Sequence, residues 1–270
     1  IDVGEHLRVV SELRAGLERG EFELHYQPIV ALADGELRGV EALVRWRHPE
    51  RGLLLPGAFI ALAERSGLIH PLGAWALAEA AQQLRRWDAR GLPPLTVSVN
   101  VSPLQLAQGD LEDAVRRALE GATLPASRLV LELTESSLVG DAEPLRARIA
   151  RLRALNVGLS IDDFGTGYSN LGYLQRFDVQ SLKIDQRFVR GLADGPQGEA
   201  IVRAIAQLAA SLGIRTVAEG IEVEAEAQRL QALGCDAGQG RWWGDAMPAA
   251  VFARWYAERF PNPAAHAAQG

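Results

Sequence analysis

Two adjacent aspartates follow an apolar run in the stretch Ser160-Ile161-Asp162-Asp163-Phe164-Gly165-Thr166-Gly167-Tyr168-Ser169-Asn170. The run from Val157 to Ile161 is typical of a buried parallel strand. Neighbouring carboxylates at the end of such a strand repel each other and are poorly solvated, so a bound cation would relieve both costs. Two hard cations sharing one carboxylate would use both aspartates. A strand ending in a polar turn explains the stretch equally well, because Asp and Gly are common turn residues.

Strand-like and helix-like patterns alternate on both sides of this stretch. Strand character marks residues 22–30, 37–46, 95–101, 129–135, 157–163, 181–185, 216–219 and 237–243. Helical character marks residues 56–66, 72–90, 104–120, 143–155, 199–212 and 224–233. A tight turn at residues 33–36 joins the first two strand patterns and predicts a hairpin.

About eight strands with intervening helices predict an α/β fold, a modified (β/α)8 TIM barrel with an irregular, partly antiparallel start. A doubly wound open sheet is the alternative, but no glycine-rich dinucleotide motif follows the first strand. We predict one barrel over residues 20–262, a helical lead-in over residues 1–19 and a flexible C-terminal tail over residues 263–270. The chain begins with Ile1 and its only methionine is Met247. We interpret this as a fragment of a longer protein.

The composition restricts the partners and the compartment. A net charge of −6 argues against a nucleic acid polymer, but it allows a small phosphorylated ligand held through metal ions. Cys235 is the only cysteine, so we expect no internal disulfide and a reducing, cytoplasmic location. No apolar run approaches the roughly 20 residues of a membrane helix. We therefore expect no membrane contact within this chain, although a longer parent protein could be membrane-tethered.

Polar side chains recur at or near the C-terminal half of the predicted strands, where a barrel places its active site. They are Glu41, Asn100, Glu132, Asp162, Asp163, Lys183, Glu219 and Gln239. A packed barrel interior prefers branched apolar side chains, and buried carboxylates are costly unless positive charge matches them. A salt bridge or a strand edge would explain any one of these residues. Their placement on successive strands indicates a shared site.

The donor atoms of this set favour magnesium or manganese over zinc, because they are oxygens and include no histidine or cysteine. His25 is the nearest histidine in sequence, and we predict a structural role for it. Several carboxylates, an amide and a lysine are typical of a two-metal phosphodiester hydrolase. Lys183 would orient or deprotonate the attacking water. Alternatively, Lys183 pairs with Asp185 at the end of a surface strand.

The same residues lie within longer motifs. Glu41-Ala42-Leu43 stands within Val40-Glu41-Ala42-Leu43-Val44-Arg45-Trp46. The other motifs are Tyr26-Gln27-Pro28, Ser98-Val99-Asn100-Val101-Ser102, Leu131-Glu132-Leu133-Thr134-Glu135-Ser136, the 162–170 loop, Leu182-Lys183-Ile184-Asp185, Ala218-Glu219-Gly220-Ile221-Glu222 and Gly238-Gln239-Gly240. Together, from about Phe22 to Pro248, they resemble the EAL domain family of cyclic di-GMP phosphodiesterases.

The resemblance implies a modified TIM barrel that cleaves cyclic di-GMP to linear 5'-pGpG with two Mg²⁺ or Mn²⁺ ions. The positions that match one metal site are Glu41, Asn100, Glu132 and Asp162. The positions that match the second are Asp162, Asp163 and Glu219, with Asp162 bridging the ions. Lys183 matches the lysine that activates water, and the expected catalytic set is completed by Glu41, Glu219 and Gln239. The positions that match substrate contacts are Gln27, Leu43, Arg45 and Asp185.

The resemblance also implies an assembly. Glu135 matches the glutamate that anchors the loop after the fifth strand, residues 164–174, which lies at the dimer interface in the family. We therefore expect a homodimer through this loop and the neighbouring helix. One departure is visible, because Arg241 precedes Trp242 where the family usually has an aromatic residue. It removes no metal ligand.

A module that binds cyclic di-GMP without cleaving it, or cleaves it only weakly, is the main alternative. Degenerate members of the family lose metal ligands, the lysine or the loop-anchoring glutamate, and this chain keeps all of them. A scaffold that only mediates protein contacts and an unrelated two-metal hydrolase on the same fold are further alternatives.

Overall fold

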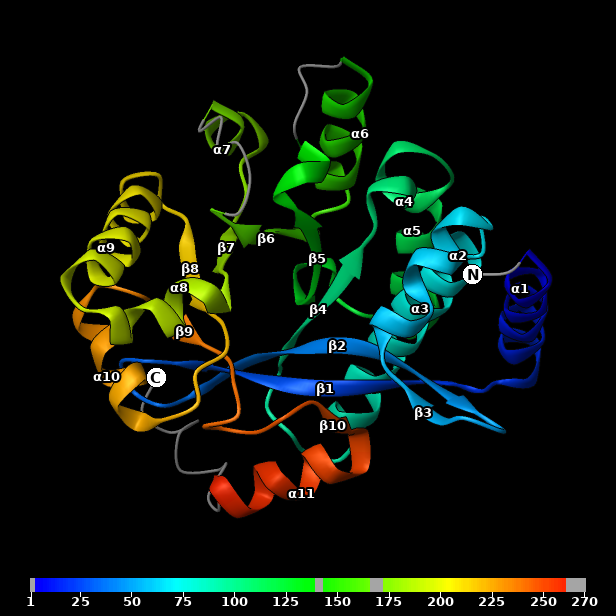
Figure 1. The fold of residues 1–270 in the computed structure, drawn as a ribbon, viewed down its shortest axis with the longest axis horizontal. Helices are drawn as coiled ribbons and strands as arrows, with labels where there is room; N and C mark the ends of the chain where they lie inside the picture. Colours follow the sequence, from blue (N-terminus) through cyan, green and yellow to red (C-terminus); the bar gives the residue numbers. More distant parts are fainter. Residues whose placement is uncertain (1–2, 139–142, 166–171, 261–270) are drawn as a thin grey trace.

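Eight strands close into a barrel in the computed structural model, which describes residues 3–138, 143–165 and 172–260 (Figure 1). In the order of the closed sheet they are β1 (Phe22–Ala31), β2 (Leu37–His48), β4 (Thr96–Val101), β5 (Leu129–Thr134), β6 (Gly158–Phe164), β7 (Ser181–Ile184), β8 (Arg215–Ala218) and β9 (Ala237–Gly238). β1 pairs with both β2 and β9, which closes the sheet. The predicted modified barrel is confirmed.

The first strand runs against the others. β1 pairs antiparallel with β2 and with β9, whereas the remaining barrel strands pair in parallel. The predicted hairpin and the partly antiparallel start are therefore confirmed. The parallel strands all end at one mouth of the barrel, where sites lie in this class of fold.

Helices surround the barrel on the outside (Figure 1). The α-helices are α1 (Val3–Arg19), α2 (Ile60–Arg65), α3 (Ile69–Asp88), α4 (Pro103–Ala107), α5 (Leu111–Ala122), α6 (Glu143–Ala154), α7 (Gly172–Phe177), α8 (Gln186–Arg190), α9 (Pro196–Ser211), α10 (Glu224–Ala232) and α11 (Ala249–Arg259). Short 3-10 helices are η1 (Pro56–Ala58), η2 (Ala126–Arg128), η3 (Glu135–Leu138) and η4 (Gly191–Asp194). Two further strands, β3 (Gly52–Leu54) and β10 (Met247–Pro248), pair with β2 and β1.

The strand sequences separate an apolar outer layer from a polar interior. On β4, the valines at 97, 99 and 101 belong to the buried core beneath the helices, and Ser98 and Asn100 alternate with them. Because successive side chains of a strand point to opposite faces, the alternating polar residues line the barrel. The same alternation on β5 places Glu132 inside.

A second apolar cluster joins α1 to the hairpin β1–β2. Its buried members are Leu13, Phe22, Trp46, Phe59, Ala63, Leu68, Ile69 and Leu72. The rings of Phe22 and Trp46 stack with centroids 5.4 Å apart, and Trp46 Nε1 donates to a Glu21 carboxylate oxygen at 3.0 Å. The imidazole Nε2 of His48 lies 3.4 Å from a carboxylate oxygen of Glu12 on α1. α1 therefore packs directly on the hairpin.

Two predicted elements differ from the structure. The helix predicted over residues 104–120 is divided into α4 and α5, because Gly109 takes a φ of +91° that interrupts it. A Cβ at this position would also meet the imidazole of His70 at 2.7 Å. The strand predicted over residues 237–243 ends at Gly238, and the chain then turns.

Two predictions fall outside the described residues. These are the C-terminal tail over residues 263–270 and the central part of the 164–174 loop, residues 166–171. Among the helices that the structure describes, none is long and apolar enough to cross a membrane.

The single thiol gives a prediction that does not depend on function. Burial, reinforced by the charge of Asp236, raises the pKa of Cys235 to about 12. The thiolate is the nucleophile, so at pH 8 the native protein should react with a disulfide reagent about 10³-fold more slowly than a free thiol with a pKa of about 8.5. Denaturant should abolish the protection. A native rate near that of the free thiol would contradict this environment.

Candidate active site

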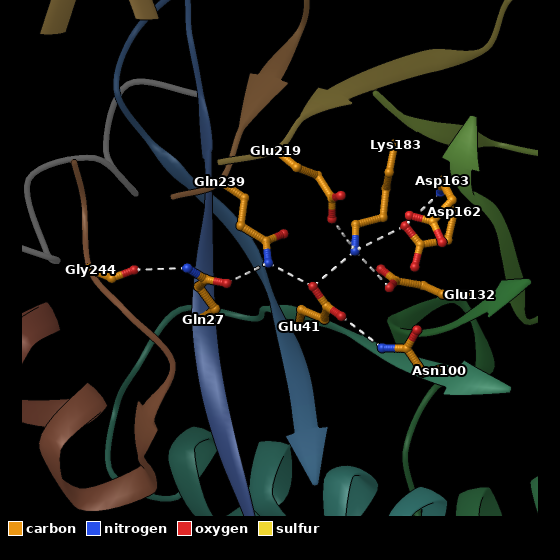
Figure 2. Close-up of polar contacts among 10 residues, drawn as sticks. All are labelled: Gln27, Glu41, Asn100, Glu132, Asp162, Asp163, Lys183, Glu219, Gln239 and Gly244. Carbon is orange, nitrogen blue, oxygen red and sulfur yellow. Dashed lines mark hydrogen bonds and ion pairs between the residues drawn. The ribbon is translucent and has the colours of Figure 1, made fainter. Parts of the chain in front are cut away.

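The C-terminal ends of the barrel strands bring together the polar residues predicted from the sequence (Figure 2). Most of these side chains come from different strands or from the residue just after one. The contacts of the cluster join Glu41 of β2, Asn100 of β4, Glu132 of β5, Asp162 of β6, Lys183 of β7, Glu219 after β8 and Gln239 after β9. Since these residues are far apart in sequence, only closure of the barrel assembles them.

Lys183 lies at the centre of the cluster and is 2% exposed. Its ammonium Nζ is 2.7 Å from Glu219 Oε1, 2.9 Å from Glu41 Oε2, 2.9 Å from Glu132 Oε2 and 3.6 Å from Asp162 Oδ1. These contacts exclude the alternative in which Lys183 sits at a surface strand end. A buried ammonium among several carboxylates is the charge compensation that such a cluster requires.

Lys183 is also the only lysine of the chain. The sequence contains 28 Lys and Arg residues, and every other one is arginine. An ammonium is a compact charge on a flexible stem, whereas a guanidinium is a wide planar group. The single nitrogen of the Lys183 ammonium therefore contacts four carboxylates at once.

The two aspartates reach the same site through a distorted strand end. Successive residues of a regular strand would point to opposite faces. Asp163 instead has a φ of +56°, and the register of β6 against β7 shifts between Ile161 and Phe164. Such a bulge re-aims a side chain, and a left-handed aspartate costs of order 1 kcal/mol or more. The distortion brings the Asp163 carboxylate beside that of Asp162.

Two side-chain amides bind Glu41 in addition to the Lys183 ammonium, and together with Gln27 they form an amide network. Asn100 Nδ2 donates to Glu41 Oε1 at 2.7 Å, and Gln239 Nε2 donates to Glu41 Oε2 at 2.6 Å. Gln239 Nε2 also donates to Gln27 Oε1 at 2.8 Å, and Gln27 Nε2 donates to the Gly244 carbonyl at 3.1 Å (Figure 2). Within the described chain, Gln239 Oε1 is buried and has no hydrogen-bond partner. It is an acceptor available to a molecule entering the site.

The carboxylates of the cluster lie so close together that their pKa values are shifted, some upward and one downward. Burial raises the pKa of Glu219 to about 7. The negative charges of Asp162 and Glu41 act in the same direction, and the positive charge of Lys183 opposes them. Burial and the charge of Glu41 also hold the pKa of Glu132 well above its usual range. Burial alone would raise the pKa of Glu41, but Lys183 and the two amides lower it below its usual range. The cluster therefore has more carboxylate than one ammonium can neutralise.

The same residues fit a divalent cation. One carboxylate oxygen from each of Asp162, Asp163 and Glu219 lies within 4.8 Å of the others. Oxygens that share a hard cation at about 2.0–2.6 Å are separated by no more than about 5 Å. This oxygen-only cluster could hold a metal ion of that class. A cation held jointly by Glu41, Glu132 and Asp162 would require the Lys183 ammonium to move from its present place.

The predicted substrate-contact residues border this cluster. Gln27 belongs to the amide network. Leu43 and Arg45 are half-buried on β2 beyond Glu41, and Arg45 donates to the Val44 carbonyl at 3.0 Å. Asp185 caps α8 and accepts from Arg187 N at 2.7 Å. Burial together with the neighbouring carboxylates of Asp162 and Asp185 raises the pKa of Asp163.

Glu135 lies beneath the loop that follows the aspartates. It is 1% exposed, and its Oε2 accepts from the Gly165 backbone N–H at 2.8 Å. Gly165 has a φ of +90°, so this contact fixes a backbone conformation that few other residues adopt.

Residues outside the cluster decide the remaining sequence predictions. His25 is structural, because it is buried and contacts the Ala246 carbonyl and the Glu23 carboxylate rather than the cluster. Arg241 is exposed and forms an ion pair with Glu222 at 2.6 Å. Sequence reasoning missed the Gly244 carbonyl that orients Gln27, because a backbone acceptor leaves no signal in side-chain patterns.

Comparison with protein families gives one match that covers most of the chain. The model described as "EAL domain" matches residues 10–246.

Individual proteins agree with this match. The bifunctional diguanylate cyclase/cyclic di-GMP phosphodiesterase MucR of Pseudomonas aeruginosa is 46% identical over 245 residues, covering 91% of this chain and 36% of that protein. The cyclic di-GMP phosphodiesterase PdeR of Escherichia coli is 40% identical over 254 residues, covering 94% of this chain and 38% of that protein. The chain thus spans little more than a third of the length of these relatives.

A solved structure shares the fold over almost its whole length. It is described as the PaMucR phosphodiesterase in complex with c-di-GMP, and it superposes with a TM-score of 0.86 at 46% identity. The match covers 91% of this chain and 99% of that chain.

Proposed function

The chain belongs to the EAL domain family, and we propose that it hydrolyses cyclic di-GMP to linear 5'-pGpG. The observation that carries the proposal is the convergence of Glu41, Glu132, Asp162 and Glu219 on the buried Lys183. A site that only bound a dinucleotide would gain nothing from burying this much uncompensated carboxylate. The names of the relatives MucR and PdeR indicate the substrate.

We propose that Mg²⁺ or Mn²⁺ occupies two adjacent places. Glu41, Asn100, Glu132 and Asp162 would hold one ion, and Asp162, Asp163 and Glu219 the other. When bound, the ions would supply positive charge to the phosphodiester and lower the pKa of a water molecule. The donor chemistry and the 4.8 Å grouping of Asp162, Asp163 and Glu219 support this assignment.

The chain's own groups would then move the proton and hold the water. As the water oxygen attacks phosphorus, its proton passes to a basic group, and the bond from phosphorus to the ribose 3' oxygen breaks. The carboxylates around Lys183 hold its pKa well above the usual range in this structure, so Lys183 could accept that proton only after bound metal had drawn those carboxylates away. The unpartnered Gln239 Oε1 is placed to accept a hydrogen bond from the water. The departing 3' oxygen takes a proton, which completes the linear product with a 5' phosphate.

Substrate position would come from the border of the site. We propose that Gln27, Leu43, Arg45 and Asp185 contact the dinucleotide. The guanidinium of Arg45 suits a phosphate, because its planar donors match two phosphate oxygens.

Incubation of the purified chain with cyclic di-GMP and Mg²⁺, followed by chromatography of the nucleotides, tests the proposal. We expect pGpG to accumulate and EDTA to stop its formation. Binding of cyclic di-GMP without any linear product, with Mg²⁺ or Mn²⁺ supplied, would favour the alternative of a receptor module.

We further propose a homodimer through the segment after β6, anchored by Glu135. The Glu135→Ala variant should fold normally, because it shortens one side chain at the end of β5 and leaves the apolar residues of the barrel core unchanged. It gives up the hydrogen bond that Glu135 Oε2 accepts from the Gly165 N–H. It should require more Mg²⁺ for half-maximal activity, since charge-assisted hydrogen bonds contribute about 1.5–3 kcal/mol and the freed segment leads out of Asp162 and Asp163. Its dimer should also be weaker.

A Mg²⁺ titration of activity and sedimentation of wild type and variant measure these two effects. The matched control is Ser136→Ala, which changes the exposed neighbouring residue. An unchanged Mg²⁺ requirement with an unchanged dimer constant would show that Glu135 has no anchoring role.

We propose that the functional unit is the barrel of residues 20–262, with α1 as a helical lead-in that packs on the hairpin β1–β2. We place the reaction in the cytoplasm, in keeping with the free, buried thiol of Cys235.

A further inference from the structure

The barrel interior holds a cavity at the mouth opposite the carboxylate cluster. Its volume is about 830 Å³, within the range of about 300–1,000 Å³ that ligand sites occupy. The lining comes from the first residues of the parallel strands and from the segments that precede them, including Thr96, Asn156, Gln180 and Arg215. The cavity extends inward as far as Glu132 and Lys183.

The strand sequences explain why this space is open. A barrel is normally filled by layers of bulky branched side chains. Here the position two residues before each residue of the carboxylate cluster forms the next layer inward. Five of these positions carry alanine-sized or smaller side chains: Gly39, Ser98, Ser160, Ser181 and Ala237. The larger members of the layer, among them Ile29 and Val217, cannot fill the space alone.

Two serines in this layer, Ser98 and Ser160, line the cavity. Ser98 is 6% exposed and Ser160 is 2% exposed. Within the residues that the structure describes, neither hydroxyl has a protein hydrogen-bond partner. Both residues line the cavity, so a molecule held there can donate a hydrogen bond to their hydroxyls or accept one from them.

The mouth of the cavity offers a positive charge. Arg38 lines it, but its guanidinium pairs with Asp34 and Glu36 at 2.6 and 3.2 Å. Arg215 is exposed at the mouth and, in the described part of the chain, forms no ion pair. Oδ2 of the neighbouring Asp236 accepts from the N–H and the hydroxyl of Thr216, at 2.8 and 2.9 Å. The guanidinium of Arg215 is therefore free to bind an anion.

We propose that this cavity binds a small sugar phosphate, with the phosphate on Arg215 at the mouth and the sugar hydroxyls on Ser98 and Ser160 inside. Phosphate suits the planar donors of a guanidinium. A sugar supplies hydroxyls that both donate and accept, which matches serine hydroxyls that do the same. The proposed phosphate and sugar contacts lie toward the mouth opposite the cyclic di-GMP site, with Glu132 and Lys183 between the two, and they do not depend on the proposed hydrolysis.

Calorimetric titration of the chain with ribose 5-phosphate, ribose and inorganic phosphate in EDTA tests this site. The chelator removes divalent metal, so failure here leaves the phosphodiesterase proposal untouched. We expect ribose 5-phosphate to bind at least tenfold more tightly than either fragment. Arg215→Gln should weaken ribose 5-phosphate about tenfold or more, which corresponds to about 1.4 kcal/mol. Arg14→Gln is the matched control, because Arg14 is an exposed arginine on α1.

A second variant distinguishes the contribution of the sugar to binding from that of the phosphate. Ser98→Ala combined with Ser160→Ala removes two hydroxyls without adding volume, and circular dichroism checks that it folds. This variant should lose the advantage of ribose 5-phosphate over phosphate. The proposal is overturned if ribose 5-phosphate does not bind the wild type, if Arg14→Gln weakens it as much as Arg215→Gln, or if the serine variant binds it like the wild type.

Discussion

Lys183→Met should reduce turnover of cyclic di-GMP by about 10²–10⁴-fold while leaving substrate affinity within a few-fold of the wild type. Methionine keeps an unbranched apolar stem of nearly the same length and lacks the ammonium. A group that holds the proton of the attacking water acts in the transition state, so its loss lowers kcat more than it raises KM. Single-turnover kinetics with separate measurement of substrate binding give both quantities. Near-normal turnover would assign Lys183 a purely structural role.

The same variant should bind divalent metal more tightly. In the structure, the ammonium of Lys183 contacts Glu41, Glu132 and Asp162, which are the acids proposed to hold one ion. Two cations that need the same oxygens compete, so removing one favours the other. Titration of Mn²⁺ followed by electron paramagnetic resonance should show this gain. Weaker Mn²⁺ binding in Lys183→Met would contradict the competition.

The single lysine of the chain allows this competition to be followed by nuclear magnetic resonance. Because Lys183 is the only lysine, protein labelled with ¹⁵N-lysine gives one side-chain ammonium signal. We expect that signal to move on addition of Mg²⁺, as the ammonium leaves its carboxylate partners. The control is Mg²⁺-free buffer of matched ionic strength. A signal that does not respond to Mg²⁺ would place the metal away from Lys183.

Asp162→Asn should reduce turnover by about 10³-fold or more, because the loss of one shared ligand affects both proposed ions, each worth several kcal/mol to the reaction. The amide keeps the shape of the carboxylate and removes its charge. Asp163→Asn should have a smaller effect that extra Mg²⁺ partly restores, since Asp163 serves one ion only. Calorimetry with Mn²⁺ should therefore show a lower stoichiometry for Asp162→Asn than for the wild type.

Asp113→Asn serves as the control, because Asp113 pairs with Arg116 on the exposed surface of α5. If Asp162→Asn binds as much Mn²⁺ as the control, the bridging role is wrong. If the Asp163→Asn variant is the more damaged of the two, the assignment of the shared ligand must be exchanged between them.

The strand pattern predicted the barrel because the relevant information is local. Alternation such as that of β4 marks which residues face inward, and it is complete within a few residues. The break at Gly109 escaped notice because the residues on either side continue a helical pattern. Its cause is a positive φ together with the imidazole of His70, and both depend on tertiary packing. The shortness of β9 likewise reflects a turn fixed by contacts outside the segment.

The site residues were predicted by their positions on strands, but their interactions were not. Sequence spacing cannot show that Asp163 adopts a left-handed backbone, although this conformation is what turns two adjacent aspartates toward one site. Nor can it show that the oxygen of Glu219 lies 2.7 Å from the nitrogen of Lys183, because strand register and barrel closure determine that distance.

The closure of the barrel also predicts where the native fold opens first. β9 pairs with β1 at only two positions, Val30 with Gly238 and Ala31 with Ala237. Local opening requires the least free energy where the fewest contacts must break. Amide hydrogens along this seam should therefore exchange faster than those of β4 or β5. The hydrogen bond from Gln239 to Gln27 crosses the same seam, so each opening event disconnects part of the amide network from Glu41. The lifetime of the assembled site is then limited by its shortest strand.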